Sequence, residues 1–511
     1  MKLWHKALKG ALLSSVLALS VTGAALGQGA GTLNIATPQD PGSWDPIDTF
    51  LVNWSAVANN VFDGLVARTP ELEIVPALAT EWEISEDGLT YTFKLRDGVK
   101  FHNGEAFDAD AVKFTFDRLL GEEGAVGPQQ SNYNSIENVE VVDPMTVVLH
   151  LSQPDPVLLT KLTGYGAMIV PPDYIAEKGD EVFNTQPVGT GPFRMASYEA
   201  RNQVTLEAFP EFWGEAPKLQ SVVFRFITEP STAVAELQSG RIDMVIPPSV
   251  PVGSIPTIEQ APNLKVVSVP GPTVYSLRFK TDEGITADER VRRALVMAVD
   301  RDTIIEAILA GQATPISSFQ SAQTFGNDPD LEPIPFDPEG AKALLAEAGV
   351  EPGATVQIDV RGNDATFNEV AQAVAAYLSA VGITATIQPY ETNVLLNDII
   401  PAGRTGAMWQ QSWGAWTFDY DNTAYLMYHE GEKWNPYGND PELDALLESQ
   451  RSMTNVAERE TVLKQIAKYV ADQALEMPLY NVNQIYAVSD RVGNFVAPPD
   501  SRLRLTDVTV E

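Results

Sequence analysis

The amino-acid sequence predicts an α/β protein of at least two lobes. Removal of an N-terminal leader would leave about 484 of the 511 residues, well beyond the ~250–300 at which a single hydrophobic core stops growing. Hydrophobic residues make up 44% of the chain, which is enough to fill more than one core. Strand patterns alternate with helix patterns in the second half, as in lobes whose helices pack on a sheet.

The first element is a leader. Three lysines within the first nine residues precede a mostly apolar stretch at residues 11–26, and Gly27 then precedes Gln28. This pattern is typical of a secretory signal peptide, residues 1–27, cleaved before Gln28. The apolar stretch is shorter than the about 20 residues of a membrane span and contains four Ser or Thr residues. We therefore expect an exported protein whose mature part is soluble.

The composition excludes several classes of protein. The chain contains no cysteine, which excludes disulfides, thiolate chemistry and a lipidated cysteine at the mature N-terminus. We therefore expect a periplasmic protein that is not a lipoprotein. The formal net charge is −34, and loss of the leader's lysines makes it more negative, so the chain would repel phosphate backbones and anionic lipids. We expect no nucleic-acid partner.

Local patterns predict the elements of the first half. Residues 84–107 alternate polar and apolar side chains around Asp-Gly and Asn-Gly pairs, which is typical of a β-meander. Helical periodicity follows in residues 108–120, where Asp108 is placed to cap the helix. Proline-rich stretches lie between residues 246 and 272, and we expect the chain to pass between lobes near residues 266–278.

The second half continues with helix and strand patterns. Apolar residues recur at three- and four-residue spacing over residues 286–311, which predicts one amphipathic helix ended by its glycine. A strand pattern at residues 354–360, a helix pattern at 367–383 and a strand pattern at 384–390 follow in order. This alternation predicts a lobe in which helices cover a sheet.

Catalytic and metal-binding motifs are missing from the sequence. It contains no G-x-S-x-G elbow, no H-E-x-x-H pair and no G-x-x-x-x-G-K-[ST] phosphate loop. One of its four histidines lies in the leader, and no two share a helix face, so we expect no metal site and no cofactor. Carboxylates are so abundant that no pair stands out as a glycosidase pair. We therefore expect a protein without catalytic residues, which is not an enzyme.

Several strings in a fixed order resemble one protein family. The strongest is PALATEWEISEDGLTYTFKLRDGVKFHNGEAFDADAVKFTFDR, residues 76–118. The strings PVGTGPFRMASYE, PEFWG, ELQSGRIDM, RVRRALVMAVDRDTII and PELDALL follow along the chain. Over essentially the whole mature chain, the sequence resembles the dipeptide- and oligopeptide-binding family of ABC-transporter extracellular solute-binding proteins, known as family 5.

The resemblance implies the α/β two-lobe fold of periplasmic binding proteins, the Venus-flytrap fold. Lobe I would comprise residues 28–270 and would include an additional subdomain at about residues 60–185. Lobe II would comprise residues 271–482. The C-terminal residues 483–511 would return to lobe I after a second crossing near residues 477–488.

The resemblance also implies a function. The protein would be a monomeric receptor of an ABC importer that captures a small polar ligand, a short peptide, between its lobes and delivers it to the membrane permease subunits. An oligosaccharide, an opine or a metal chelate are alternative ligands for the same role. An exported hydrolase and a chaperone are the alternatives from other classes of protein.

The segment MWQQSWGAWTFDYDNTAY carries the expected ligand site. Large aromatic rings and carboxylates can line a pocket for a small ammonium-bearing ligand, and such rings can equally belong to a hydrophobic core, as we expect for about half of them. The resemblance places Asp419 where peptide receptors of this family bind the ligand's α-amino group, with Asp421 as the alternative. The backbone of residues 415–417 would hydrogen-bond an extended ligand. The expected contacts from this segment are Trp413, Ala415, Trp416, Thr417, Asp419, Tyr420 and Asp421.

Four further candidates lie elsewhere in the chain. Asn53 and Trp54 align with the region that lines the pocket from the opposite lobe, and Tyr275 lies near the first crossing. Arg361 resembles the position where some dipeptide receptors hold the ligand carboxylate, and an exposed surface arginine is the alternative interpretation. The sequence does not decide whether His429 contacts the ligand.

Overall fold

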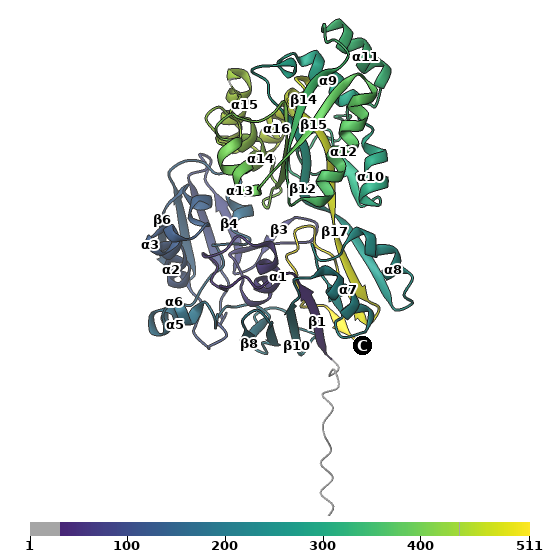
Figure 1. Ribbon diagram of the computed structural model, residues 1–511. Helices are drawn as coiled ribbons and strands as arrows, with labels where there is room; N and C mark the ends of the chain where they lie inside the picture. Colours follow the sequence, from purple (N-terminus) through teal and green to yellow (C-terminus); the bar gives the residue numbers. More distant parts are fainter. Residues whose placement is uncertain (1–30, 439) are drawn as a thin grey trace, which may run out of the picture.

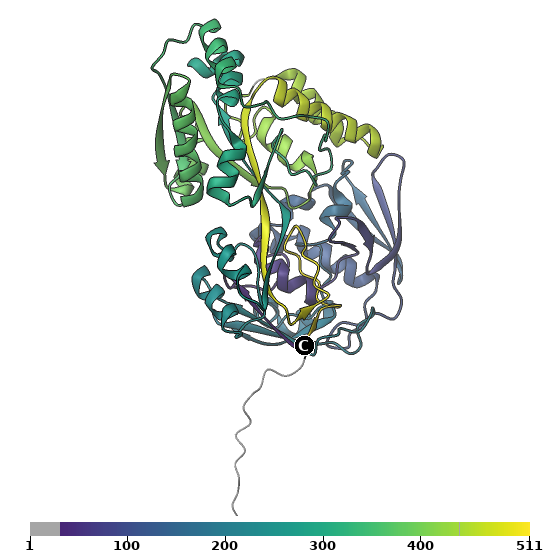
Figure 2. The ribbon, with the colours of Figure 1, turned by 90° about the vertical axis from the view of Figure 1, so that its right-hand side faces the viewer.

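The computed structural model describes residues 31–438 and 440–511, so the expected leader, residues 1–27, lies outside the described residues. Lobe II lies above lobe I in Figure 1, and two long antiparallel strands run through both lobes, as the turned view of Figure 2 also shows. These strands are β12 (Leu264–Phe279) and β17 (Glu476–Ser489). The expected crossings, near residues 266–278 and 477–488, fall within them.

Among the described residues, eleven strands form one sheet that extends across both lobes. In lobe I the order is β8-β9-β10-β1-β11-β17, and β1 pairs parallel to both β10 and β11. Buried apolar side chains from these strands and from helix α1 form the core of lobe I. The strands and helices of this part are β1 (Thr32–Thr37), β8 (Phe193–Glu199), β9 (Gln203–Ala208), β10 (Ser221–Phe226), β11 (Met244–Val245), α1 (Val52–Val61), α7 (Pro230–Gln238) and α8 (Ile255–Glu259).

A separate antiparallel sheet forms the left side of lobe I in Figure 1, with its own hydrophobic core. Its order is β4-β5-β7-β6, and helix α2 (Ala109–Leu120) packs on it. Asp108 caps α2 as predicted, because its carboxylate accepts hydrogen bonds from two backbone N–H groups of the first turn at 3.0 and 3.2 Å. The strands are β4 (Ala79–Ile84), β5 (Thr90–Leu95), β6 (Ile136–Asp143) and β7 (Thr146–Leu151).

The predicted meander at residues 84–107 is only partly correct. It contains β5 and the turn before it, but β5 pairs next with β7, which lies some 50 residues further along the chain. After β5 the chain makes turns closed by a single bridge between Lys100 and Ala106. The alternating pattern continues past β5 because these side chains alternate between core and solvent without joining the sheet.

Lobe II continues the long sheet in the order β12-β16-β14-β15, in which β14 runs parallel to both of its neighbours. The strand, helix and strand predicted at residues 354–390 are confirmed as β14, α12 and β15. The elements of lobe II are β13 (Ala313–Pro315), β14 (Ala354–Arg361), β15 (Ile383–Tyr390), β16 (Met408–Gly414), α9 (Glu289–Met297), α10 (Arg301–Leu309), α11 (Pro338–Glu347), α12 (Ala365–Ala380), α14 (Tyr420–Tyr428), α15 (Pro441–Arg451) and α16 (Val456–Asp472).

The prediction of a single helix over residues 286–311 is wrong. The segment forms two helices, α9 and α10, which are separated at Asp300. Asp300 has an extended backbone and caps α10 by accepting the N–H of Thr303 at 3.0 Å. An aspartate at this position competes for backbone hydrogen bonds and starts a new helix, although the apolar periodicity continues through it.

The remaining elements are short and connect the larger ones. They are β2 (Val66–Arg68), β3 (Ile74–Pro76), α3 (Glu122–Val126), α4 (Leu158–Lys161), α5 (Pro172–Lys178), α6 (Asp180–Phe183), α13 (Thr392–Val394), β18 (Val492–Gly493) and β19 (Thr509–Val510). Within residues 31–438 and 440–511, no helix combines the length and apolar character needed to cross a bilayer.

Candidate ligand-binding site

The two lobes meet at a short segment of lobe II, residues 415–418, which we call the bridging loop. It leaves β16 and ends just before helix α14. The ring of Trp416 packs edge-on against Phe50 and Tyr165 of lobe I, with centroid distances of 5.8 and 5.7 Å. The guanidinium of Arg502, from the C-terminal return, lies 5.7 Å from the same indole. Among the described residues, Trp416 is therefore the one aromatic predicted as a ligand contact in this segment whose ring packs against rings of lobe I.

Arg68, at the end of β2 in lobe I, binds the backbone of the bridging loop. It donates to the carbonyl oxygens of Trp416 at 3.0 Å and Thr417 at 3.2 Å. Its guanidinium also donates to Asp500 at 2.5 Å. Burial, and then the neighbouring charge of Arg502, lower the pKa of Arg68 to about 10. Two carbonyls that we expected to face an extended ligand are thus bound by the protein itself.

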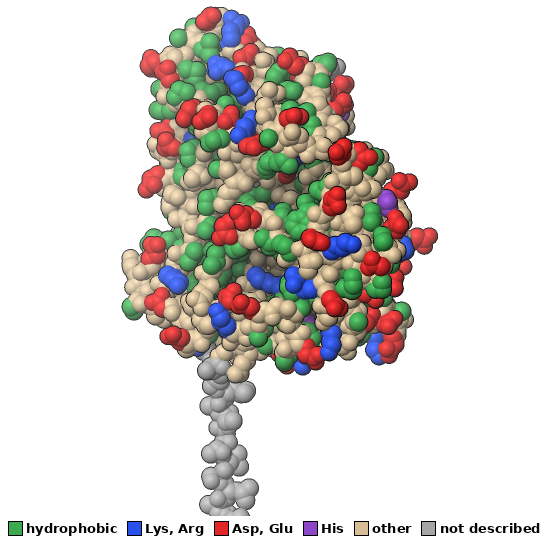
Figure 3. Space-filling model, turned by 180° about the vertical axis from the view of Figure 1, so that it is seen from behind, with side chains coloured by type: hydrophobic (Ala, Val, Ile, Leu, Met, Phe, Trp, Pro, Cys, Tyr) green, Lys and Arg blue, Asp and Glu red, His purple; other side chains and the backbone are tan. Residues whose placement is uncertain are grey.

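Two cavities lie near this region, one lined by Thr417 and Phe418 of the bridging loop and one lined by Arg68 and Arg502, which contact that loop. The first, of about 490 Å³, is lined by the loop, by Asp419 and Arg459 of lobe II, and by Tyr91 and Asp155 of lobe I. We call it the interlobe cavity. The second, of about 590 Å³, lies between the C-terminal return and the rest of lobe I, and we call it the tail cavity. Both volumes suit small ligands. Seen from behind, the molecule is hollowed in its lower half, and Lys or Arg side chains lie in the hollow (Figure 3).

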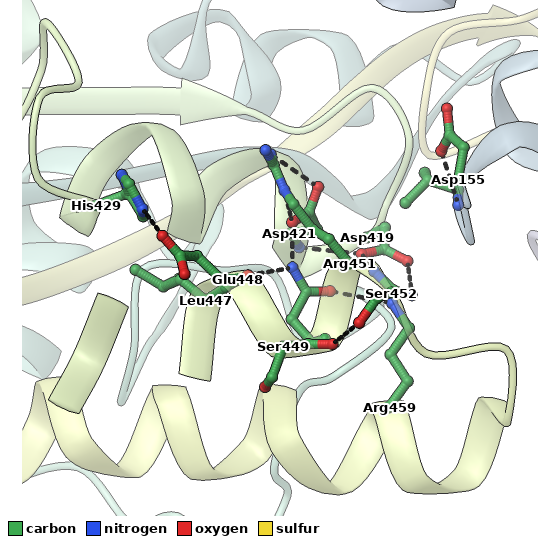
Figure 4. Close-up of polar contacts among 12 residues, drawn as sticks. Asp155, Asp419, Asp421, His429, Leu447, Glu448, Ser449, Arg451, Ser452 and Arg459 are labelled. Atoms are coloured by element: carbon green, nitrogen blue, oxygen red, sulfur yellow. Dashed lines mark hydrogen bonds and ion pairs between the residues drawn. The ribbon is translucent and has the colours of Figure 1, made fainter. Parts of the chain in front are cut away.

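Asp419 is buried and caps helix α14 by accepting the N–H of Asp421 at 3.0 Å. Both of its carboxylate oxygens also bind Arg459 of helix α16, at 2.6 and 2.7 Å, as Figure 4 shows. Burial raises the pKa of the carboxyl group, and the guanidinium of Arg459 opposes that shift. The carboxylate that we expected to bind a ligand ammonium is therefore engaged within lobe II, on the wall of the interlobe cavity.

The backbone before Asp419 is held in an uncommon conformation. Phe418 has a φ of 52°, in the left-handed region that non-glycine residues seldom occupy. Phe325 donates its N–H to the carbonyl of Phe418 at 2.8 Å and accepts the N–H of Tyr420 at 3.1 Å, and these two backbone hydrogen bonds keep the chain in this turn. The turn directs Asp419 into lobe II while Trp416, three residues earlier, projects toward lobe I.

The alternative acid and two predicted aromatics also lie within lobe II. Asp421 binds Arg451 at 2.7 and 3.2 Å (Figure 4). Trp413 donates its indole N–H to Asn422 at 3.1 Å and packs against the core beneath α14. Tyr420 is fully buried in that core. The structure therefore argues against a ligand contact for Tyr420, because no surface of the side chain is left to bind one.

Arg361 and Tyr275 lie together in lobe II. Arg361 ends β14, its guanidinium donates to the hydroxyl of Ser412, and its buried Nε has no hydrogen-bond partner within the described residues. Tyr275 pairs with Ser412 across β12 and β16, and its ring stacks on Phe367 at 5.6 Å. The structure thus brings together two residues that the sequence predicted separately.

The remaining candidates lie farther from the bridging loop. Trp54 is buried in helix α1 and stacks on Tyr165 at 5.7 Å, so it supports the ring that Trp416 contacts. Asn53 donates to the carbonyl of Gln39 at 2.6 Å. His429 binds Glu448 at 3.1 Å at the C-terminal end of α14, the end opposite Asp419 (Figure 4).

Several residues that build this site were not predicted from the sequence. Arg68, Asp500 and Arg502 carry no motif, and Phe50 and Tyr165 lie in stretches without a periodic pattern. A buried strand or tail segment that contains arginine is the only sequence signal that could have indicated them, since buried arginines need partners. No group of three His, Cys, Asp or Glu side chains suited to a metal ion occurs in the part of the chain that the structure describes.

Comparisons with known proteins identify a family and a fold for this chain. Residues 73–435 match the model of the bacterial extracellular solute-binding proteins, family 5. The glutathione-binding protein GsiB of Pectobacterium atrosepticum is 27% identical over 475 residues, which covers 91% of each chain. The dipeptide-binding protein of Escherichia coli is 27% identical over 537 residues, covering 98% of this chain and 99% of that one.

Solved structures share the fold over nearly the whole chain, and each comparison covers 94% of this chain. HbpA2 from Haemophilus parasuis superposes with a TM-score of 0.86 at 25% identity and is covered completely. DppA from Helicobacter pylori, in complex with the peptide STSA, has a TM-score of 0.74 at 26% identity and is covered to 98%. NikA from Brucella suis, in complex with Fe(III)-EDTA, has a TM-score of 0.84 at 25% identity and is covered completely.

The predicted two-lobe α/β fold and the predicted family are therefore confirmed. The relatives are substrate-binding proteins of ABC transporters rather than enzymes. This chain belongs to the family 5 bacterial extracellular solute-binding proteins and is a receptor component of an ABC transporter.

Proposed function

We propose that this receptor captures a short peptide between its lobes and delivers it to the permease of an ABC importer. The bridging loop carries the proposal, because lobe II seats Trp416 against lobe I beside a cavity lined by both lobes. A ligand in the interlobe cavity would contact lobe I and lobe II at once. Its binding energy would then favour the state in which the lobes touch.

The relatives support a peptide as the ligand. Two are named for binding glutathione and dipeptides, and one solved structure contains the peptide STSA. A metal chelate is the second candidate, because the structure of NikA from Brucella suis is a complex with Fe(III)-EDTA. All of these ligands combine a small size with several polar groups, which a mixed polar and apolar cavity can accommodate.

Named residues would carry the recognition. Arg361 lies outside the lining of the interlobe cavity and would bind the carboxylate of a ligand that extends toward β14, since it lies close to Tyr275 and its buried Nε has no hydrogen-bond partner among the described residues. Trp416 lies outside the lining of that cavity and would stabilise the closed state through its ring contacts with lobe I. For Asp419 we favour a positioning role, because a ligand ammonium would have to displace Arg459 from a buried pair with two hydrogen bonds.

Closure of the lobes requires a ligand that prefers the closed state. Shifting the ratio of closed to open molecules from 1:99 to 99:1 needs about 5.5 kcal/mol of such preference. A buried charge-assisted hydrogen bond contributes about 1.5–3 kcal/mol and a neutral one about 0.5–1.5 kcal/mol. A few contacts of these kinds, made only when the lobes meet, would supply the required preference.

The proposal is tested by identifying the natural ligand. The protein is purified without refolding, denatured, and the released small molecules are identified by mass spectrometry. We expect short peptides, which should then raise the melting temperature of ligand-free protein when added back. Release of a chelate or an oligosaccharide, together with no thermal shift from a library of di- and tripeptides, would refute the peptide assignment.

We also propose that the mature receptor begins near Gln28, is exported to the periplasm without a lipid anchor, and acts as a monomer. The leader pattern and the absence of cysteine support the first two statements. N-terminal sequencing of protein from the periplasmic fraction checks the cleavage site, and sedimentation analysis checks the monomer. A membrane-bound fraction that survives a salt wash would contradict the lack of an anchor.

A further inference from the structure

The tail cavity contains a buried excess of positive charge. Arg68 and Arg502 both line it, and their side chains are only 2% and 5% exposed. Asp500 is the carboxylate that both guanidiniums approach, at 2.5 Å from Arg68 and 3.5 Å from Arg502. One carboxylate therefore balances two guanidiniums, which leaves a net charge of one unit in a place shielded from water.

Asp500 stays ionised in this arrangement. Its burial would favour the neutral form, but Arg68 and Arg502 together hold the pKa of its carboxyl group below the ordinary value. The pKa of Arg68 is lowered to about 10 by burial and by Arg502, which still leaves it charged at neutral pH. Arg68, Arg502 and Asp500 therefore keep a net positive charge at neutral pH, because no proton passes between them.

Each guanidinium also has a donor that is not used. The Nε of Arg68 and one terminal nitrogen of Arg502 are buried and have no hydrogen-bond partner among the described residues. The other donors of the two groups bind the bridging loop, Asp500 and Thr163. Unused donors beside unbalanced positive charge are the features of a site built for an anion.

The other charged groups of the cavity do not balance this excess. Asp63 is buried but binds Arg504 at 3.0 Å and also accepts from Trp213 and Thr190. The remaining carboxylates that line the cavity are solvent-exposed side chains at its rim, where water and salt screen them. They are Glu71, Glu215 and Asp507.

From these observations we infer that Arg68 and Arg502 form an anion subsite in lobe I, and that the receptor prefers ligands carrying a carboxylate group at that end. The inference rests on the proposed function and narrows it to acidic peptides. Arg68 also holds the carbonyls of the bridging loop, and Arg502 lies over Trp416. An anion bound here would therefore contact the groups that join the two lobes.

The test compares peptides that differ only in charge. Binding of Ala-Glu and Ala-Gln to ligand-free receptor is measured by calorimetry, with wild-type protein and with Arg502→Gln. We expect the wild type to bind Ala-Glu about 10- to 100-fold more tightly than Ala-Gln, as for a charge-assisted hydrogen bond, and Arg502→Gln to lose most of this preference. Arg504→Gln is the matched control, because it lines the same cavity but has Asp63 as its partner, and it should keep the preference.

A second measurement separates this inference from the proposed function. If neither peptide binds the wild type, succinate and inorganic phosphate are titrated while tryptophan fluorescence is followed. Trp416→Phe is titrated in parallel to identify the signal of Trp416 among the nine tryptophans, since Arg502 lies beside that indole. Saturation that is lost in Arg502→Gln but kept in Arg504→Gln supports the anion subsite even if the ligand is not a peptide. Equal affinity for Ala-Glu and Ala-Gln, or anion binding that survives in a folded Arg502→Gln, overturns the inference. Melting curves and Arg502→Lys, which keeps the charge, guard against misfolding.

Discussion

Replacing Asp419 by alanine should lower the free energy of unfolding of lobe II by about 4 kcal/mol. The substitution leaves Arg459 buried and unpaired, which costs about 3–5 kcal/mol in measured cases, and it removes the cap of α14, which is worth about 1 kcal/mol. The two effects share one carboxylate and are not additive, so we take the middle of the first range. Asp419 and Arg459 have side-chain exposures of 8% and 4%, so solvent does not screen the loss.

Unfolding in guanidinium chloride, followed by tryptophan fluorescence, measures this loss of stability, because lobe II contains Trp413 and Trp416. Asp421→Ala is the matched control. Its partner Arg451 is 41% exposed, and its second partner, Gln450, also donates to the carbonyl of Leu447, so we expect a loss of at most about 1 kcal/mol. The double variant Asp419→Leu with Arg459→Met removes both charges and should recover most of the stability. If Asp419→Ala unfolds like the wild type but no longer binds ligand, the carboxylate contacts the ligand and our reasoning is refuted.

Three further predictions follow from the same contacts. Burial raises the pKa of Glu476 from 4.5 to about 7, so the folded state holds this proton more tightly than the unfolded state. The stability that Glu476 contributes is fully present below pH 4.5 and is lost as pH rises through 7, by up to about 3 kcal/mol. The denaturant midpoint of the wild type should therefore fall over this pH range, and that of Glu476→Gln should not. Trp416→Ala removes the ring contacts between lobes and should weaken ligand binding about tenfold while small-angle scattering shows a more open molecule; unchanged scattering with bound ligand would contradict this. Asp108→Ala should cost about 1 kcal/mol by loss of the α2 cap, and a stability equal to the wild type would show that the cap contributes nothing.

Local patterns predicted the elements at residues 108–120 and 354–390 because the causes of these elements are local. The strands and helix of residues 354–390 follow from the spacing of apolar side chains, and Asp108 caps α2 through atoms two and three residues away. The same approach failed at residues 286–311, where apolar periodicity continues across Asp300 although the backbone turns there. Periodicity reports which side chains face a core and does not report whether one helix or two present them.

The candidate site was less predictable because its contacts join distant parts of the chain. The sequence indicated Asp419 and Trp416 as two members of one cluster, yet they face different lobes. The partner of Asp419 lies 40 residues further along the chain, and Arg68 binds a carbonyl 349 residues away. Arg68 and Arg502 were missed for the same reason.

The sequence by itself determined the family, the α/β class and the approximate bounds of some regular elements, such as α2 and α12, because family strings and apolar spacing are written in consecutive residues. Only the tertiary structure decided which charges are already paired and which are left over. Asp419 and Arg459 neutralise each other inside lobe II. Arg68 and Arg502 share the single carboxylate of Asp500, so one positive charge is left unbalanced. Charge balance in a buried site depends on every group that folding brings within a few ångströms, and no local pattern records that sum.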